Sequence, residues 1–266
     1  MHQIVKRSKF VRQPFLRRDA MRHIIKILVS ATTLGTIAAF LPPFAVSEQA
    51  ATAPVPAIEQ PSAGTANSYT TELITSSDMY NKLPRINNSG SLVWQAKVGD
   101  HFQIFYKAVT SEAPIQLTNN ALDNTDPRIN DQDEIVWMGG DKNHSEIFLY
   151  AKGGVTQLTE TTLANRHPKL NNNGEVVWIA GSADSDGKVE EFEAFHYVDG
   201  VITQVTDNNK FNVQVRINDA GTMMWRGKGE TDFDIFMRTD GAITQVTVDG
   251  GEEMNPQISS GGNMVW

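Results

Sequence analysis

The stretch Leu92-Val93-Trp94 decides the fold, because the same apolar run ending in tryptophan returns four times along the 266-residue chain. The later copies are Ile135-Val136-Trp137, Val176-Val177-Trp178, Met223-Met224-Trp225 and Met264-Val265-Trp266. All five tryptophans of the protein belong to this set, and their successive spacings are 43, 41, 47 and 41 residues. A period of this length indicates one supersecondary unit that is copied along the chain.

Three further motifs repeat in step with the tryptophans. Each unit opens with a short run of the type Pro-Arg-Ile-Asn, found at 84–87, 127–130, 168–171, 215–218 and 256–259. A second apolar run follows each internal tryptophan and contains Phe105, Phe148, Phe195 or Phe236. A closing Gln-Leu-Thr or Gln-Val-Thr ends at Thr118, Thr159, Thr206 or Thr247, always nine residues before the next unit opens. The constant gap indicates a fixed geometric crossing between units.

The repeat predicts a fold. Each unit contains four short β runs, which are separated by Asn, Asp, Gly and Ser clusters and lack helical periodicity. Four such runs form an antiparallel meander, and meanders of this period are the blades of a β-propeller. We therefore expect an all-β propeller with four complete blades and a partial fifth. Its predicted inter-blade core consists of Trp94, Trp137, Trp178, Trp225, Trp266, Phe105, Phe148, Phe195 and Phe236.

Asparagine-rich turns follow the opening runs. Segments such as 87–90 and 171–174 place side chains that can bond the nearby backbone before a glycine able to take positive φ. We interpret them as tight hairpin turns and not as ligand loops. In the second unit Asp133 stands at the glycine position, and aspartate takes the left-handed region less easily.

The last unit stops after Trp266 with two of its four strands. A bare sheet edge is unfavourable, so we expect the sequence to be a C-terminally truncated fragment. Alternatively, the run Leu73-Ile74-Thr75, which stands in the register of a closing strand, pairs with the C-terminal strands and closes a ring.

The chain divides into three parts. Residues 1–47 combine a basic extension with an apolar run from Ile27 to Phe44 and small residues before Glu48, which indicates a secretory signal peptide. Met21 is an alternative start to Met1, and an uncleaved membrane anchor is the alternative interpretation of the apolar run. Residues 48–68 are rich in Ala, Pro and Thr and predict a flexible linker. Residues 69–266 are the propeller repeats.

Composition narrows the function classes. The chain has no cysteine, so core packing alone must hold the fold. After removal of residues 1–47, 15 basic residues face 30 acidic ones, a net charge of about −15. Such a surface repels phosphate backbones and anionic lipids. We therefore expect neither nucleic-acid binding nor membrane insertion after signal removal.

The repeat resembles a known family. The pattern Pro-x-Ile-Asn-x-x-Gly-x-Val-Val-Trp, followed by Glu-Ile-Phe-x-Tyr and Gln-Leu-Thr, is similar to the TolB-type, WD-like β-propeller repeat of bacterial envelope and secreted proteins, over residues 69–266. The chain departs from the family pattern where Asn-rich turns replace Ser-Pro-Asp-Gly, where Trp replaces Phe, and at Val215 and Arg238. The resemblance implies the propeller architecture and a non-catalytic binding role, and it assigns no functional residue.

Candidate chemistry is sparse. The sequence contains no nucleophile elbow, phosphate loop or zinc-protease motif. His101, His144, His167 and His196 fall at different repeat positions, so they predict no cluster. The insertion 182–193 of the third unit resembles a calcium loop, with Asp184, Asp186, Glu190 and Glu193 as candidate ligands. Ser182 stands where the first carboxylate belongs, so we favour a solvated hairpin tip with weak or no calcium binding. No other cofactor is expected.

The sequence therefore favours an exported, periplasmic or cell-surface propeller that binds a protein or an envelope component and is not an enzyme. Two alternatives stay open. The chain could be the propeller portion of a secreted hydrolase, a peptidase or a polysaccharide-acting enzyme, whose catalytic domain lies outside the sequence. It could also be a structural repeat of the cell surface, since a fold alone does not fix a function.

Overall fold

All regular structure in the described part of the chain is β-strand. The computed structural model describes residues 26–30, 69–75, 78–189, 191–248 and 250–266. Strands β1 (Lys26–Ser30) and β2 (Tyr69–Leu73) come first and pair with each other antiparallel. The other strands, β3 to β20, follow the sequence repeats. The predicted all-β class is confirmed in the described residues.

Each complete repeat forms a four-stranded blade. Blade 1 contains β3 (Asn81–Ile86), β4 (Leu92–Val98), β5 (His101–Lys107) and β6 (Ile115–Gln116). Blade 2 contains β7 (Asp123–Ile129), β8 (Ile135–Gly140), β9 (Ser145–Ala151) and β10 (Gly154–Gln157). Blade 3 contains β11 (Ala164–Leu170), β12 (Val176–Gly181), β13 (Glu193–Val198) and β14 (Val201–Gln204). Blade 4 contains β15 (Asn212–Ile217), β16 (Met223–Lys228), β17 (Phe233–Thr239) and β18 (Ala242–Gln245).

The partial fifth unit is a two-stranded sheet of β19 (Gln257–Ile258) and β20 (Met264–Val265). Consecutive strands within every blade pair antiparallel, as a meander requires. One parallel contact, between Ala164 and Ser145, joins blades 2 and 3 into a single eight-stranded sheet. The expected four blades and partial fifth are therefore present.

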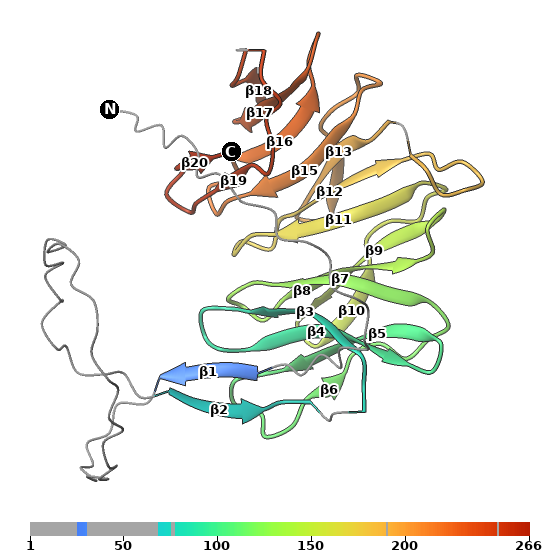
Figure 1. Cartoon of the computed structure of the whole chain (residues 1–266), viewed down its shortest axis with the longest axis vertical. Coiled ribbons are helices and arrows are strands. Elements are labelled where there is room, and N and C mark those ends of the chain that lie inside the picture. Colours follow the sequence, from blue (N-terminus) through green and yellow to red (C-terminus); the bar gives the residue numbers. More distant parts are fainter. Residues whose placement is uncertain (1–25, 31–68, 76–77, 190, 249) are drawn as a thin grey trace, which may run out of the picture.

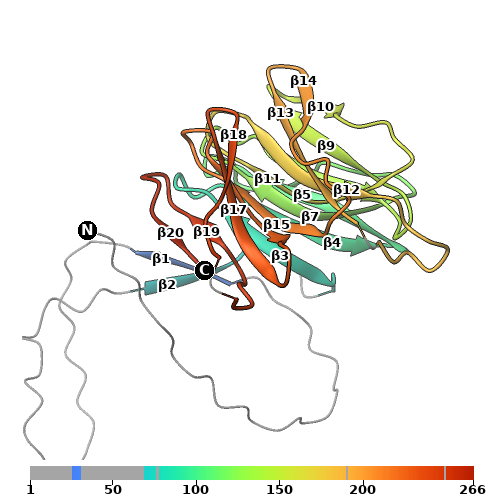
Figure 2. The same ribbon diagram turned by 90° about the horizontal axis from the view of Figure 1, so that it is seen from above.

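The blades follow one another in sequence order, from blade 1 at the bottom of Figure 1 to blade 4 at the top, with β19 and β20 beside blade 4. Figure 2 shows the same succession from above. The first strands of successive units contact one another, β3 with β7, β7 with β11, β11 with β15 and β15 with β19. We call this row of first strands, with the turns that follow them, the inner edge.

The tryptophan and phenylalanine positions fill the space between blades. Each of the first four tryptophans is opposite a phenylalanine on the next strand, and the paired rings stack with centroids 5.7–6.0 Å apart. These tryptophans are at most 2% exposed. Trp266 differs, since its side chain is 46% exposed. In the described chain, β20 pairs with β19 alone, so no further blade covers this ring.

A buried polar joint accompanies each of the first four tryptophans. The indole NH of Trp178 donates to Asn165 Oδ1 at 2.9 Å, and the Asn165 amide donates to Glu146 of the preceding blade at 3.2 Å. The Thr159 hydroxyl donates to the same carboxylate. The same indole bond recurs in the other blades, from Trp94 to Asn81, Trp137 to Asn124 and Trp225 to Asn212, at 3.0–3.2 Å. Because the asparagine touches both its own blade and the preceding one, it fixes how the two blades sit together.

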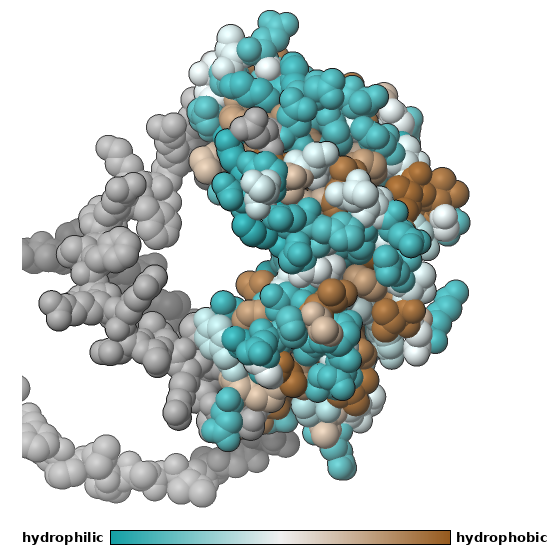
Figure 3. Space-filling view, turned by 90° about the vertical axis from the view of Figure 1, so that its right-hand side faces the viewer, coloured by the Kyte–Doolittle hydropathy of each residue, from teal (hydrophilic) through white to brown (hydrophobic). Residues whose placement is uncertain are grey.

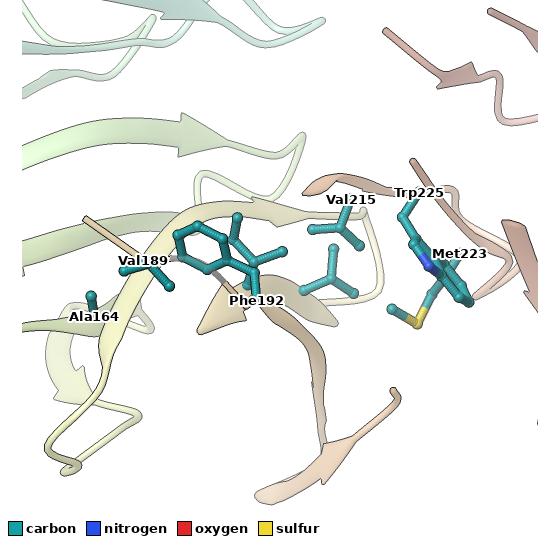
Figure 4. Close-up of a cluster of buried hydrophobic side chains, with 8 residues drawn as sticks. Ala164, Val189, Phe192, Val215, Met223 and Trp225 are labelled. Atoms are coloured by element: carbon teal, nitrogen blue, oxygen red, sulfur yellow. The ribbon is translucent and has the colours of Figure 1, made fainter. Parts of the chain in front are cut away.

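The insertion of the third unit contributes to the core. Its tip at Asp184 and Asp186 is exposed, as a solvated hairpin predicts, but Val189 and Phe192 at its base are only 7% and 6% exposed. Figure 4 shows these two side chains in the cluster that also contains Trp225 of blade 4. The insertion is therefore partly a structural element that covers the boundary between blades 3 and 4.

The N-terminal strands do not close the ring in the described chain. Strand β2 pairs with β1, while β19 and β20 pair with each other. Ile74 packs on the Trp94 cluster and the Thr75 hydroxyl accepts a bond from Asn81 at 3.3 Å. Ahead of blade 1, this run therefore occupies the place that the closing motif of the preceding blade holds ahead of each later blade. Apart from Lys26–Ser30, the predicted signal peptide and the linker lie outside the described residues. No helix in the described residues has the length and apolarity needed to cross a bilayer.

Removing the Trp178 side chain should cost roughly 3–5 kcal/mol of unfolding free energy, the range for deleting a large core aromatic. The matched control is Trp266→Ala, because this ring is 46% exposed. Denaturant titration of Trp178→Ala and Trp266→Ala measures both values. Equal midpoints for the two variants would contradict the assignment of Trp178 to the inter-blade core.

Candidate functional site

The inner edge carries a polar cavity to which all five repeats contribute. A cavity of about 270 Å³ lies where the turns after the first strands meet. Each of the first four repeats contributes one aliphatic residue and two polar residues to its lining, and the fifth repeat contributes Ile258 and Ser260. The aliphatic residues of the first four are Ile86, Ile129, Leu170 and Ile217. Five segments far apart in sequence therefore converge on one locus.

A ladder of asparagine side chains links the turns. The Asn87 amide donates to the Asn130 carbonyl at 2.9 Å, Asn130 to Asn171 at 3.0 Å, Asn171 to Asn218 at 2.9 Å, and Asn218 to Ser259 at 3.3 Å. The Oδ1 atom of each asparagine also accepts the backbone NH four residues on, at 2.9–3.0 Å. Each asparagine thus closes the hairpin of its own repeat and binds the next repeat. These two roles account for asparagine at this position.

A second ladder runs one residue further along and alternates amide with carboxylate. Asp131 accepts from the Asn88 backbone and side chain at 2.9 and 2.8 Å. Asn172 lies between the two carboxylates, since its amide donates to Asp131 at 3.2 Å and to Asp219 at 3.1 Å. The hydrogen bonds from the Asn88 backbone and side chain lower the pKa of Asp131. The turns are hairpins as predicted, and they also form the mouth of the cavity.

The turn of the second repeat shows why aspartate is tolerated there. Asp133 has φ of 60°, the left-handed conformation that Gly90, Gly174 and Gly221 adopt in the equivalent turns. Its carboxylate accepts a bond from the Asn87 side chain at 2.7 Å. This contact between repeats offsets the backbone strain that a non-glycine residue incurs at positive φ.

Four basic side chains form a row on the inner edge. They are Arg85, Arg128, Lys169 and Arg216, which occupy the second position of the opening motif in repeats 1 to 4, and Gln257 holds this position in repeat 5. A bulge precedes each basic residue, and the bulged residue has positive φ in every repeat. All four basic residues are half-buried. The motif was evident in the sequence, but its basic position was given no role there.

A single carboxylate lies within this row. Asp126 pairs with Arg128 at 2.8 Å and contacts His167 at 3.3 Å. Burial alone would raise the pKa of Asp126, but the His167 hydrogen bond and the charges of Arg128 and Lys169 lower it to about 2. Burial lowers the pKa of Lys169 to about 7, and the charges of Arg128, Arg216 and Arg85 act in the same direction while Asp126 opposes them. The row therefore holds positive charges that repel one another.

Two of the calcium candidates, Asp184 and Glu193, line one cavity of about 670 Å³ in the described part of the chain. Asp184 Oδ1 accepts the backbone NH groups of Asp186 and Lys188, both at 2.9 Å, and so caps its own turn. Glu193 accepts from the Asn212 side chain at 3.2 Å and from the backbone NH groups of Asn208 and Asn209. In the preceding blade, Glu146 accepts in the same way from the Asn165 side chain and from the backbone NH of Thr161. The position of Glu193 in the repeat explains these bonds, because this position belongs to the inter-blade joint. Glu190 lies outside the described residues. Among the described residues no group of three or more His, Asp or Glu could hold a metal ion.

Each of the four histidines of the repeats has a carboxylate partner, and two of them, His101 and His144, line one cavity of about 480 Å³. The pairs are His101 with Asp123, His144 with Glu146, His167 with Asp126, and His196 with Glu175, at 3.0–3.8 Å. His167 is the member that reaches the inner edge, from the bulge of β11. Sequence reasoning also passed over the joint asparagines, although all four stand 13 residues before their tryptophan. That constant spacing was the signal that could have identified them.

Replacing Lys169 by Met should stabilise the protein at pH 6 in sodium chloride free of multivalent anions. A folded pKa near 7, below the usual 10.5, means that charging Lys169 opposes folding. This penalty is complete below about pH 7 and disappears as the pH rises toward 10.5, so the gain of the variant should shrink over that window. It is roughly 3–5 kcal/mol at most, from the size of the pKa difference. Urea titrations from pH 6 to 10 measure it, with the exposed Lys97→Met as control. A gain that does not change with pH would contradict the prediction.

Comparisons with known proteins bear on the fold. No family model matches the chain, and no curated protein matches its sequence. A puromycin hydrolase structure matches with a TM-score of 0.53 at 11% identity, over 73% of this chain and 34% of that one. Dipeptidyl peptidase 4 of Porphyromonas gingivalis matches with 0.52 at 12% identity, over 72% of this chain and 36% of that one. A structure assigned to TolB of Agrobacterium tumefaciens gives 0.49 at 14% identity, over 68% and 71%.

The chain spans about a third of the length of the puromycin hydrolase and of the dipeptidyl peptidase. At such low identities the likeness shows the fold alone, and the part matched is the β-propeller domain. The chain therefore has the β-propeller fold that its repeats and its resemblance to TolB-type proteins predicted.

Proposed function

We propose that the chain is an exported, non-catalytic β-propeller that binds a protein or a cell-envelope component at the turn side of its inner edge. The convergence of five repeats on the 270 Å³ cavity is the observation that carries this proposal. Ligand sites are concave and hold a few precisely placed polar groups. The lining of this cavity is mostly polar, because each of the first four repeats contributes two Asn or Asp side chains beside one aliphatic residue.

The rim formed by these Asn and Asp side chains is rigid enough to present a defined surface. The two ladders tie each turn to the next through side-chain and backbone hydrogen bonds, so the rim atoms are held in place before a ligand arrives. A site that is ordered in advance loses less entropy on binding. Elsewhere, the face in Figure 3 is mostly hydrophilic, and its hydrophobic residues lie in separate patches. The inner edge therefore supports binding better than that face does.

A second function is favoured by one observation, the match to peptidases. The solved structures that share the fold include a puromycin hydrolase and a dipeptidyl peptidase, and this chain spans about a third of each. On this alternative the repeats are the propeller portion of a secreted hydrolase. Translating the gene beyond Trp266 distinguishes the binding protein from the hydrolase, because the hydrolase hypothesis requires a catalytic domain there.

Photo-crosslinking in intact cells tests the binding site. Ser260 lines the cavity, and replacing it with benzoylphenylalanine should give a crosslinked product with the partner. The matched control places the same residue at Val201 on β14, which is 60% exposed and lies on an outer strand. A product from Val201 and none from Ser260 would move the site away from the inner edge.

Export is tested separately. If residues 1–47 are a cleaved signal peptide, the protein recovered from the periplasmic or culture fraction should begin at or near Glu48. N-terminal sequencing of that fraction checks this. Recovery with residues 1–20 still attached would refute the proposed processing.

A further inference from the structure

The basic row of the inner edge has more positive charge than its surroundings neutralise. Each side chain folds back on its own strand, where the guanidinium groups donate to the carbonyls of Pro84, Pro127 and Val215 at 2.8–3.0 Å. The Lys169 ammonium donates to the carbonyls of His167 and Pro168 at 3.1 and 3.0 Å. These bonds use a fraction of the available donors, since arginine carries five N–H groups and lysine three.

Asp126 is the one carboxylate that forms an ion pair with this row in the described part of the chain. Arg216 has a neutral partner instead, the Gln257 side-chain oxygen at 3.4 Å. Burial lowers the pKa values of Arg128 and Lys169, and the charges of Arg85 and Arg216 lower both further. Three arginines and a lysine of lowered pKa beside one carboxylate repel one another, and an added anion would relieve the repulsion.

The row lies on the same strands as the cavity lining but is not part of that lining. Ile86, Ile129, Leu170 and Ile217 line the cavity, and each follows a basic residue directly in sequence. Because successive side chains of a strand point to opposite faces, the row lies on the other face of the first strands. Guanidinium groups bind carboxylate and phosphate oxygens through paired, charge-assisted hydrogen bonds.

We propose that Arg85, Arg128, Lys169 and Arg216 form a binding site for a small ligand with several anionic oxygens, either carboxylate or phosphate groups. The proposal rests on the binding function proposed above and names its ligand chemistry. The positive charge of the row is local, because the repeats as a whole carry an excess of acidic residues. Arg128 and Asp126 hold each other in place, while Arg85, Lys169 and Arg216 have no carboxylate partner among the described residues and receive the ligand.

Titration calorimetry on the processed full chain tests the site, with citrate and pyrophosphate as probes and sodium chloride at the same ionic strength as control. Citrate and pyrophosphate represent the carboxylate and phosphate sources, so the tighter of the two identifies the source. Arg85→Gln and Arg216→Gln should each weaken binding about 10-fold or more, the effect of losing one charge-assisted bond. Lys97 is exposed and lies on β4, outside the row. The control variant Lys97→Gln also removes one charge and should bind the probes like the wild type.

Gln257 provides a second pair of variants at an exposed position where folding is not at risk. Gln257→Glu places a carboxylate beside Arg216 and should weaken binding, whereas Gln257→Arg adds a fifth cation and should strengthen it. Equal affinity in both variants, or no heat from either probe beyond chloride, overturns the oxyanion site. Crosslinking from Ser260 that persists in that case would leave the binding function standing and reject its ligand chemistry alone.

Discussion

The buried hydrogen bond from each of the first four indoles to an asparagine is the interaction on which the propeller depends. The asparagine lies on the first strand of its blade, accepts from the tryptophan of the second strand and, in blades 2 to 4, donates to the preceding blade. Apolar stacking by itself is non-directional. The indole and amide groups are fully buried, so each must keep its partner or lose about 1–3 kcal/mol. The joint therefore selects one angle between adjacent blades.

Because the joint is fixed, the first strands of successive blades lie side by side. Residues at the same position of successive repeats therefore form a row. The Asn ladder, the alternating Asn and Asp ladder and the basic row are three such rows on one edge. A residue type that recurs once per repeat is spread over 200 residues in sequence, yet its copies lie within reach of one another in space. Small differences between repeats, such as Gln257 in place of a basic residue, then change the charge of a whole row.

The same register explains why acidic residues in the insertion differ in role. Glu193 stands where Gln103, Glu146 and Asp234 stand in the other blades, directly before the residue whose backbone NH bonds the closing threonine. Its carboxylate therefore belongs to the joint. Asp184 and Asp186 have no counterpart in the other repeats and lie at the exposed tip. The insertion thus combines a buried structural base with an exposed tip, and the tip contacts blade 2 where the Lys142 ammonium donates to the Asp186 carbonyl at 2.8 Å.

The sequence by itself determined the fold class, the four blades with a partial fifth, and the tryptophan core of the internal repeats. It could do so because strand period, turn residues and aromatic spacing are local properties that the chain repeats five times. It also contained the joint asparagines, at a constant 13 residues before each tryptophan, but a polar residue gives no sign of burial until its partners are known. Only the tertiary structure decided that the Pro-Arg-Ile-Asn runs meet on one inner edge, that Trp266 is half exposed, and that Val189 and Phe192 are buried. These outcomes depend on contacts between residues some 40 apart in sequence, and no local pattern specifies which faces such contacts cover.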